Sequence, residues 1–165
     1  MSSDADTPAV KEVTVRDFYP APQIDDAAFG VDLYLDGELA GHASNDGRGG
    51  CHRYEFHTRQ QREAFFAYAR AWASEHDKRT SEPADALVNW LCDEFEYAEG
   101  ARDLVSKGAT TVLLIEKGPR WLNDDHDRDP DIYESTHLVG IRGGKDPQEV
   151  AAEQGAHKWR VIPTE

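Results

Sequence analysis

The chain is poor in cysteine and has no long apolar run. Its two cysteines, Cys51 and Cys92, are too few for a disulfide framework and do not form a CxxC pair, so we expect reduced thiols in a reducing compartment. No apolar run approaches the roughly 20 residues that span a bilayer, and the polar start of the chain is not a signal peptide. These absences favour a soluble, cytoplasmic protein that has no membrane partner.

Basic residues are also scarce, because 18 Lys and Arg stand against 32 Asp and Glu and give a formal net charge of −14. A field of this sign repels phosphate, so we expect no binding to nucleic-acid backbones. The excess of acid is consistent with solubility, with a salty host, or with mimicry of nucleic acid towards a basic partner. Solubility is the simplest of these three interpretations.

The residues that are present are typical of a globular protein. The sequence has 165 residues, of which 39% are apolar and 30% charged, which is enough to build a core. We expect residues 1–8 to form a disordered tail and residues 9–165 to form a single α+β domain.

Local patterns predict an α+β fold, with a mainly antiparallel sheet of five to six strands covered by three to four helices. Two apolar runs joined by Asp36-Gly37, a dipeptide suited to a type I′ turn, predict a hairpin over 29–44. A regular two-residue turn would place His42 opposite Val31, on the core face. Other strands are expected near 13–19, 51–56, 110–118, 133–141 and 157–162, and helices over 59–75, 83–100 and 101–107 and after Asp146.

Residues 44–54 read SNDGRGGCHRY and are the best candidate for a site. Asparagine and aspartate side chains can bond to their own backbone, and glycines adopt conformations closed to other residues, so an ordinary loop explains the composition. Alternatively, the glycine N–H groups form an anion nest with an arginine beside it, although the Walker and GxGxxG patterns are both absent. The candidate ligand-binding residues are Asn45, Asp46, Gly47, Arg48, Gly49, Gly50, His52 and His42.

Two histidines lie close to this loop. With His42 on the core face and His52 on the side of Tyr54, the two imidazoles could face each other and hold a metal together with Asp46 or Cys51. Two histidines without a compact ligand motif are more often packing residues, so we predict neither a metal nor a cofactor. Cys51 and His52 are neighbours on an expected strand and point opposite ways, so they cannot form a nucleophile pair.

The acidic segment 123–134 begins with the aspartate spacing of an EF-hand. Pro130 and Thr136 stand where the motif needs glycine and glutamate, which excludes an EF-hand. Loose binding of calcium or magnesium and a solvated surface loop are the two interpretations that remain for this segment.

The run DG-ELAGHA-SNDGRGG-CHRY resembles a pattern of small, uncharacterised bacterial and phage proteins. They share a strand, a short turn, and then S-N-D-G-x-G-G followed by an aromatic residue. The resemblance covers a small part of the chain and implies no activity, but it implies that the loop matters and that the setting is a phage or a mobile element. The matching residues are Asp36, Gly37, Ser44, Asn45, Asp46, Gly47, Gly49, Gly50 and Tyr54.

Three functions are compatible with these observations. The first is a small soluble binding protein, an accessory factor of a phage or mobile element, whose loop 44–54 binds an unknown protein or a small anionic ligand. The second is an enzyme acting on a nucleotide or phosphorylated small molecule, with Asp46 or His52 as general base and Arg48 as charge clamp. The third is an acidic inhibitor of a basic partner.

Overall fold

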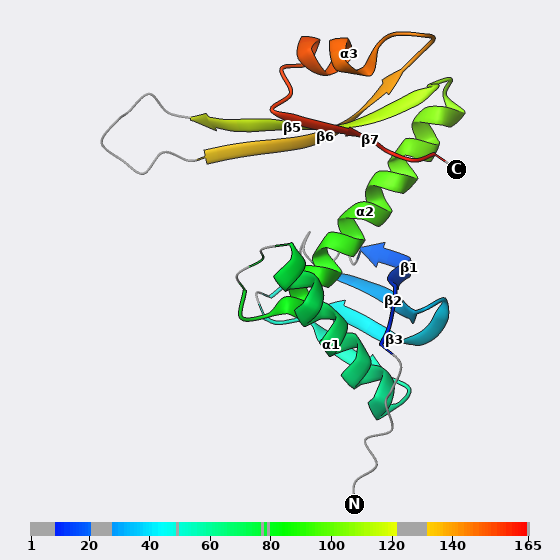
Figure 1. Ribbon diagram of the computed structural model, residues 1–165, viewed down its shortest axis with the longest axis vertical. Helices are drawn as coiled ribbons and strands as arrows, with labels where there is room; N and C mark the ends of the chain where they lie inside the picture. The colour runs from blue at the N-terminus through cyan, green and yellow to red at the C-terminus, as the bar shows by residue number, and fades with distance from the viewer. Residues whose placement is uncertain are drawn as a thin grey trace, which may run out of the picture. The chain divides into compact units, whose positions relative to one another are not determined.

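The computed structural model describes residues 9–20, 28–48, 50–76, 78, 80–121 and 132–164. The chain divides into two compact units, Met1–Phe95 and Glu96–Glu165 (Figure 1). The predicted α+β class and antiparallel pairing are confirmed. The predicted single sheet of five to six strands is wrong, because the described residues hold seven strands in two sheets, together with three helices.

The first unit contains a four-stranded sheet in which each strand pairs with the next one along the chain. Helices cover one face of this sheet, and the buried core lies between them. The elements are β1 (Val13–Pro20), β2 (Phe29–Leu35), β3 (Glu38–Asn45), β4 (Arg53–Phe56), α1 (Arg59–Glu75) and the first part of α2 (Pro83–Ser106).

The hairpin of β2 and β3 has the predicted two-residue turn. Asp36 and Gly37 both have positive φ, 49° and 84°, as a type I′ turn requires. The Asp36 carboxylate also accepts hydrogen bonds from the backbone N–H groups of Lys11 and Glu12, at 2.9 and 2.8 Å. One turn residue therefore also ties the chain before β1 to the hairpin.

A β-bulge changes which face His42 occupies. The pairing starts as predicted, with Tyr34 opposite Leu39, but an extra residue on β3 then brings Gly41 opposite Leu33. The shift places His42 opposite Asp32, on the face of the sheet away from the helices. The prediction that His42 faces the core is therefore wrong.

Both helices of the first unit begin near the predicted residues. Thr58 and Gln61 form the predicted capping box at the start of α1. α2 is one helix, whereas two were predicted with a break at Gly100. A Cβ at Gly100 would lie 2.6 Å from a side-chain atom of Leu138, so close packing explains this glycine inside the helix.

The second unit contains a three-stranded sheet in the order β6-β5-β7, with β5 in the centre as predicted. Apolar residues on the two faces of β5 pack against different partners, which are α3 on one face and the end of α2 on the other. Figure 1 shows α3 lying over the sheet. The elements are β5 (Thr111–Trp121), β6 (Ile132–Ile141), α3 (Pro147–Glu153) and β7 (Lys158–Val161).

The start of α3 follows the predicted pattern. Asp146 is the N-cap and accepts a hydrogen bond from the N–H of Gln148 at 2.9 Å, and Pro147 takes the first helical position. None of the helices in the described part of the chain has the length and apolar character needed to cross a membrane.

Candidate functional site

The Asn45 side chain organises the glycine-rich loop. Its Oδ1 accepts a hydrogen bond from the N–H of Gly47 at 2.7 Å, and its Nδ2 donates to the carbonyl oxygen of Gly50 at 2.9 Å. Asp46 makes a second turn of the same kind, because its Oδ1 accepts from the N–H of Arg48 at 3.0 Å. Gly47 has a φ of 78°, a conformation that favours glycine. The local sequence therefore sets the shape of the loop.

Hydrogen bonds at both ring nitrogens hold His52. Nδ1 lies 2.9 Å from Asn45 Nδ2, which can only donate, so this nitrogen accepts. Nε2 lies 2.8 Å from Asn89 Oδ1 and therefore donates. The arrangement fits the neutral tautomer with its proton on Nε2, and the ring also packs edge-on against Phe29 with centroids 4.8 Å apart.

The start of α2 fixes the residues that follow the loop. The two carboxylate oxygens of Asp85 accept from the N–H of His52 at 3.0 Å and from the hydroxyl of Tyr54 at 2.6 Å. The thiol of Cys51 donates to Glu82 Oε1 at 2.6 Å. Hydrogen bonds to charged acceptors are stronger than neutral ones, so these carboxylates at the start of α2 help to hold the residues that follow the loop, which also pair with β3.

The same carboxylates raise the pKa values of two neighbouring groups. Burial, and then the hydrogen bond to Asp85, raise the pKa of Tyr54 far above its usual range, which keeps the hydroxyl protonated as a donor. The hydrogen bond and the negative charge of Glu82 raise the pKa of the Cys51 thiol. Neither group is activated as a nucleophile or base at neutral pH.

We expect Cys51, although exposed, to react slowly with iodoacetamide. The raised pKa lowers the fraction of thiolate, which is the reactive form. The variant Glu82→Gln removes the charge and should react several-fold faster at pH 8 in a Cys92→Ser background. Mass spectrometry of the alkylated protein over time measures the rate. Equal rates with and without Glu82 would contradict the assigned role of this carboxylate.

Cys51, Glu82 and Asp85 are also the described residues whose ligand atoms lie close enough to hold a metal, within 4.8 Å of one another. Each of these atoms already takes part in a hydrogen bond that holds the loop. The raised pKa of the thiol also works against a thiolate ligand.

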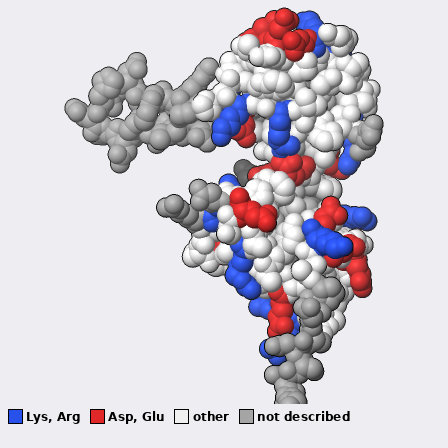
Figure 2. Space-filling view, viewed as in Figure 1, with Lys and Arg blue, Asp and Glu red and all other residues white. Residues whose placement is uncertain are grey.

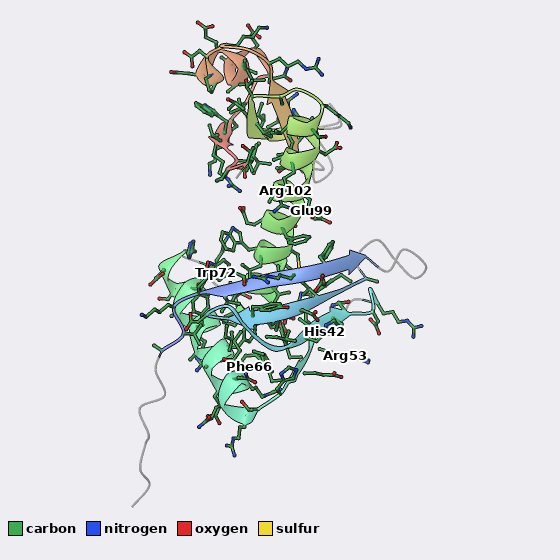
Figure 3. The ribbon with its side chains drawn as sticks, turned by 90° about the vertical axis from the view of Figure 1, so that its right-hand side faces the viewer. His42, Arg53, Phe66, Trp72, Glu99 and Arg102 are labelled. Carbon is green, nitrogen blue, oxygen red and sulfur yellow. The ribbon has the colours of Figure 1, made fainter. Side chains whose placement is uncertain are left out.

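The hypothesis of a metal held by His42 and His52 is wrong. His42 Nδ1 lies 3.1 Å from Asp32 on the face of the sheet away from the helices, whereas His52 contacts Asn89 of α2. Figure 3 shows His42 near Arg53 and apart from Trp72 of α1. The bulge in β3 thus separates the two imidazoles that the sequence pattern placed together.

Among the other predicted site residues, some are exposed and some lie outside the residues that the structure describes. Asp46, Arg48 and Gly50 are exposed. Gly49 and residues 123–131 of the acidic segment 123–134 lie outside the described residues, so the calcium hypothesis and the part of the nest hypothesis that concerns Gly49 stay predictions.

Sequence reasoning missed the part of the site that comes from α2. Glu82, just before α2, and Asp85 and Asn89 within it each come more than 30 residues after the loop residue that they contact. Acidic residues at a helix start are explained locally by the helix dipole. No local signal connects them to the loop.

A hollow of about 370 Å³ runs along α1 but takes no residue from the loop. Small and apolar side chains line most of it. The lining residues are Ala9, Val10, Gln60, Glu63, Ala64, Ala67, Tyr68 and Ala71.

Comparison with known proteins gives no relative from which a function could be carried over. None of the family models, curated proteins or solved structures matches the chain.

Proposed function

We propose that the chain is a binding protein that recognises a protein partner through the loop Asn45–His52. The observation that carries this proposal is the preorganised loop, in which the Asn45 side chain bonds to three other groups. A loop that is already ordered loses little conformational entropy on binding. Its exposed side chains, Asp46 and Arg48, are then the groups that meet the partner.

Two observations favour a protein partner over a small anion. The N–H groups of Gly47 and Arg48 already donate to side chains, so they are not available for an anion nest. The carboxylates of Glu82 and Asp85 lie beside the loop and repel negative charge. The exposed arginine can still bond to a carboxylate on the surface of a protein.

The enzyme alternative lacks support from the chemistry of these side chains. His52 has partners at both nitrogens, and Cys51 and Tyr54 are held in their protonated forms. The inhibitor alternative needs a largely acidic face, whereas Figure 2 shows Lys and Arg interspersed with Asp and Glu on the face that it presents. The motif resemblance adds a phage or mobile-element setting to the proposal.

Affinity enrichment from a lysate of the source cells tests the proposal. Wild type and Arg70→Glu, which changes an exposed arginine on α1, should enrich the same partner, and Arg48→Glu should lose it. The affinity for the purified partner should fall about tenfold or more in Arg48→Glu, as for the loss of a charge-assisted contact. Retention of the partner by Arg48→Glu would contradict the proposal.

A thermal-shift panel of nucleotides and sugar phosphates distinguishes the enzyme alternative from the proposed binding of a protein partner. A ligand at a hundred times its dissociation constant stabilises a fold by about 2.7 kcal/mol, which is visible in the midpoint. We expect no shift. A shift that is lost in Arg48→Ala would favour the enzyme or the small-ligand interpretation instead.

A further inference from the structure

One face of α1 is exposed and hollowed. Figure 1 shows α1 lying over the sheet of the first unit, and the hollow of about 370 Å³ runs along this helix. Ala64, Ala67 and Ala71 line the hollow, and the last two are exposed. These alanines recur at helical spacing, so they share one face. Small side chains on a helix face allow another helix to approach closely, because the distance between packed helices depends on the side chains at the contact.

Two residues of opposite charge lie on this face of α1. Glu63 and Arg70 are exposed and seven residues apart, which is close to two turns, so they lie on the same side of the helix. Ala67 lies between them at helical spacing. Glu63 already binds Arg59 through Oε1, at 2.8 Å. Arg70 forms no ion pair within the described part of the chain, so its charge has no carboxylate beside it.

The order of these charges is complementary to itself only in one direction. If α1 packs antiparallel against α1 of a second copy near Ala67, Glu63 of each copy lies opposite Arg70 of the other. Parallel packing would place Glu63 opposite Glu63 and Arg70 opposite Arg70, and like charges brought together in an interface cost several kcal/mol. An antiparallel contact of this kind uses the same patch on both copies and closes at two of them.

We propose that the chain forms a homodimer through antiparallel contact between the hollowed face of α1 and the same face of a second copy. Ala67 lies next to the two-fold axis, and Glu63 and Arg70 of the two copies form two equivalent ion pairs that fix the direction. Oε2 of Glu63 accepts the new contact, since a carboxylate has two acceptor oxygens. Covering the hollow supplies most of the affinity, because exposed ion pairs alone contribute little.

Sedimentation equilibrium of charge-reversed variants tests the proposal. The wild type should dimerise in the micromolar range. Arg70→Glu and Glu63→Arg should each raise the dissociation constant of the dimer about tenfold or more, because each brings two pairs of like charges together. The double variant Glu63→Arg/Arg70→Glu exchanges the two charges and should restore the affinity of the wild type. Helix damage would not be reversed by a second substitution.

Two comparisons separate this contact from the general effect of charge. Arg53→Glu makes the same change of charge as Arg70→Glu at an exposed position on β4 and should dimerise like the wild type. Glu63→Arg reduces the net negative charge of the chain, so weaker repulsion alone would strengthen its dimer. A weaker dimer in this variant therefore reports the loss of the specific contact.

Ala67→Trp tests the position of the axis. A large side chain there holds the two helices apart, so the dissociation constant should rise about tenfold or more. Ala67→Ser is the matched control, because serine is nearly as small as alanine and should dimerise normally. Circular dichroism of both variants checks that the helix is intact.

Three results would overturn the proposal. The first is a wild type that stays monomeric throughout the micromolar range, which would leave the hollow to another occupant. The second is a double charge exchange that fails to restore the dimer. The third is an Ala67→Trp variant that dimerises like the wild type. The contact uses no residue of the glycine-rich loop, so Arg70→Glu should lose the dimer and still enrich the partner of the loop.

Discussion

Replacing Gly41 by alanine is expected to destabilise the first unit by about 3 kcal/mol, within the range known for overpacked sites. A Cβ at this position would collide with the carbonyl oxygen of Glu55 and lie 3.0 Å from the Cα of Phe56. Both atoms belong to the backbone of β4, which cannot rotate away as a side chain can. We therefore expect β4 to separate from β3.

Hydrogen exchange measures this change within the first unit alone. The amide of His57 donates to the carbonyl of Ala40 at 2.9 Å and reports on the contact between β3 and the residue after β4. Its exchange should become much faster in Gly41→Ala. The matched control is Gly50→Ala, because a Cβ there meets nothing within 4 Å. Similar exchange rates in the two variants would contradict the steric explanation.

Replacing Asp85 by alanine is expected to cost about 2 kcal/mol or more, because two donors lose their acceptor. The hydroxyl of Tyr54 is partly buried, and the N–H of His52 lies beside it, so water replaces the carboxylate poorly. The loop should then lose its fixed position relative to α2. Chemical denaturation and exchange of the His52 amide both measure the effect.

Glu82→Ala is the control for the loss of charge at the start of α2. It removes a carboxylate from the same end of the helix, but one whose partner is the exposed thiol of Cys51. Its effect should stay within about 0.5 kcal/mol, as for most surface substitutions. If Asp85→Ala costs no more than Glu82→Ala, the two hydrogen bonds of Asp85 do not contribute to the link between the loop and α2.

Much of the fold could be predicted from the sequence because its signals are local. The turn at Asp36-Gly37, the capping box at Thr58 and the cap at Asp146 each depend on residues within a few positions. These features act through the backbone of their own segment. Tertiary contacts therefore did not change the structures that these local signals predict.

The face of His42 could not be predicted from alternation, because a single extra residue in β3 inverts every later side chain. Gly41 was the available signal, since an isolated glycine inside a strand pattern often marks a bulge or a close approach of two backbones. Both explanations apply at this position. The contacts of Asp85 are different in kind, because they join segments that only the folded chain brings together.

The order of strands in the two sheets has a consequence for the rate of folding. In the first sheet every strand pairs with its neighbour in the chain, so each pairing closes a short loop. In the second sheet β7 pairs with β5 only after β6 and α3 have been placed between them in the chain. Local pairings form faster than distant ones, so the first sheet should assemble before β7 joins the second. Until that step, β5 presents an unpaired apolar edge to solvent, and this is the period in which the chain is most prone to aggregate.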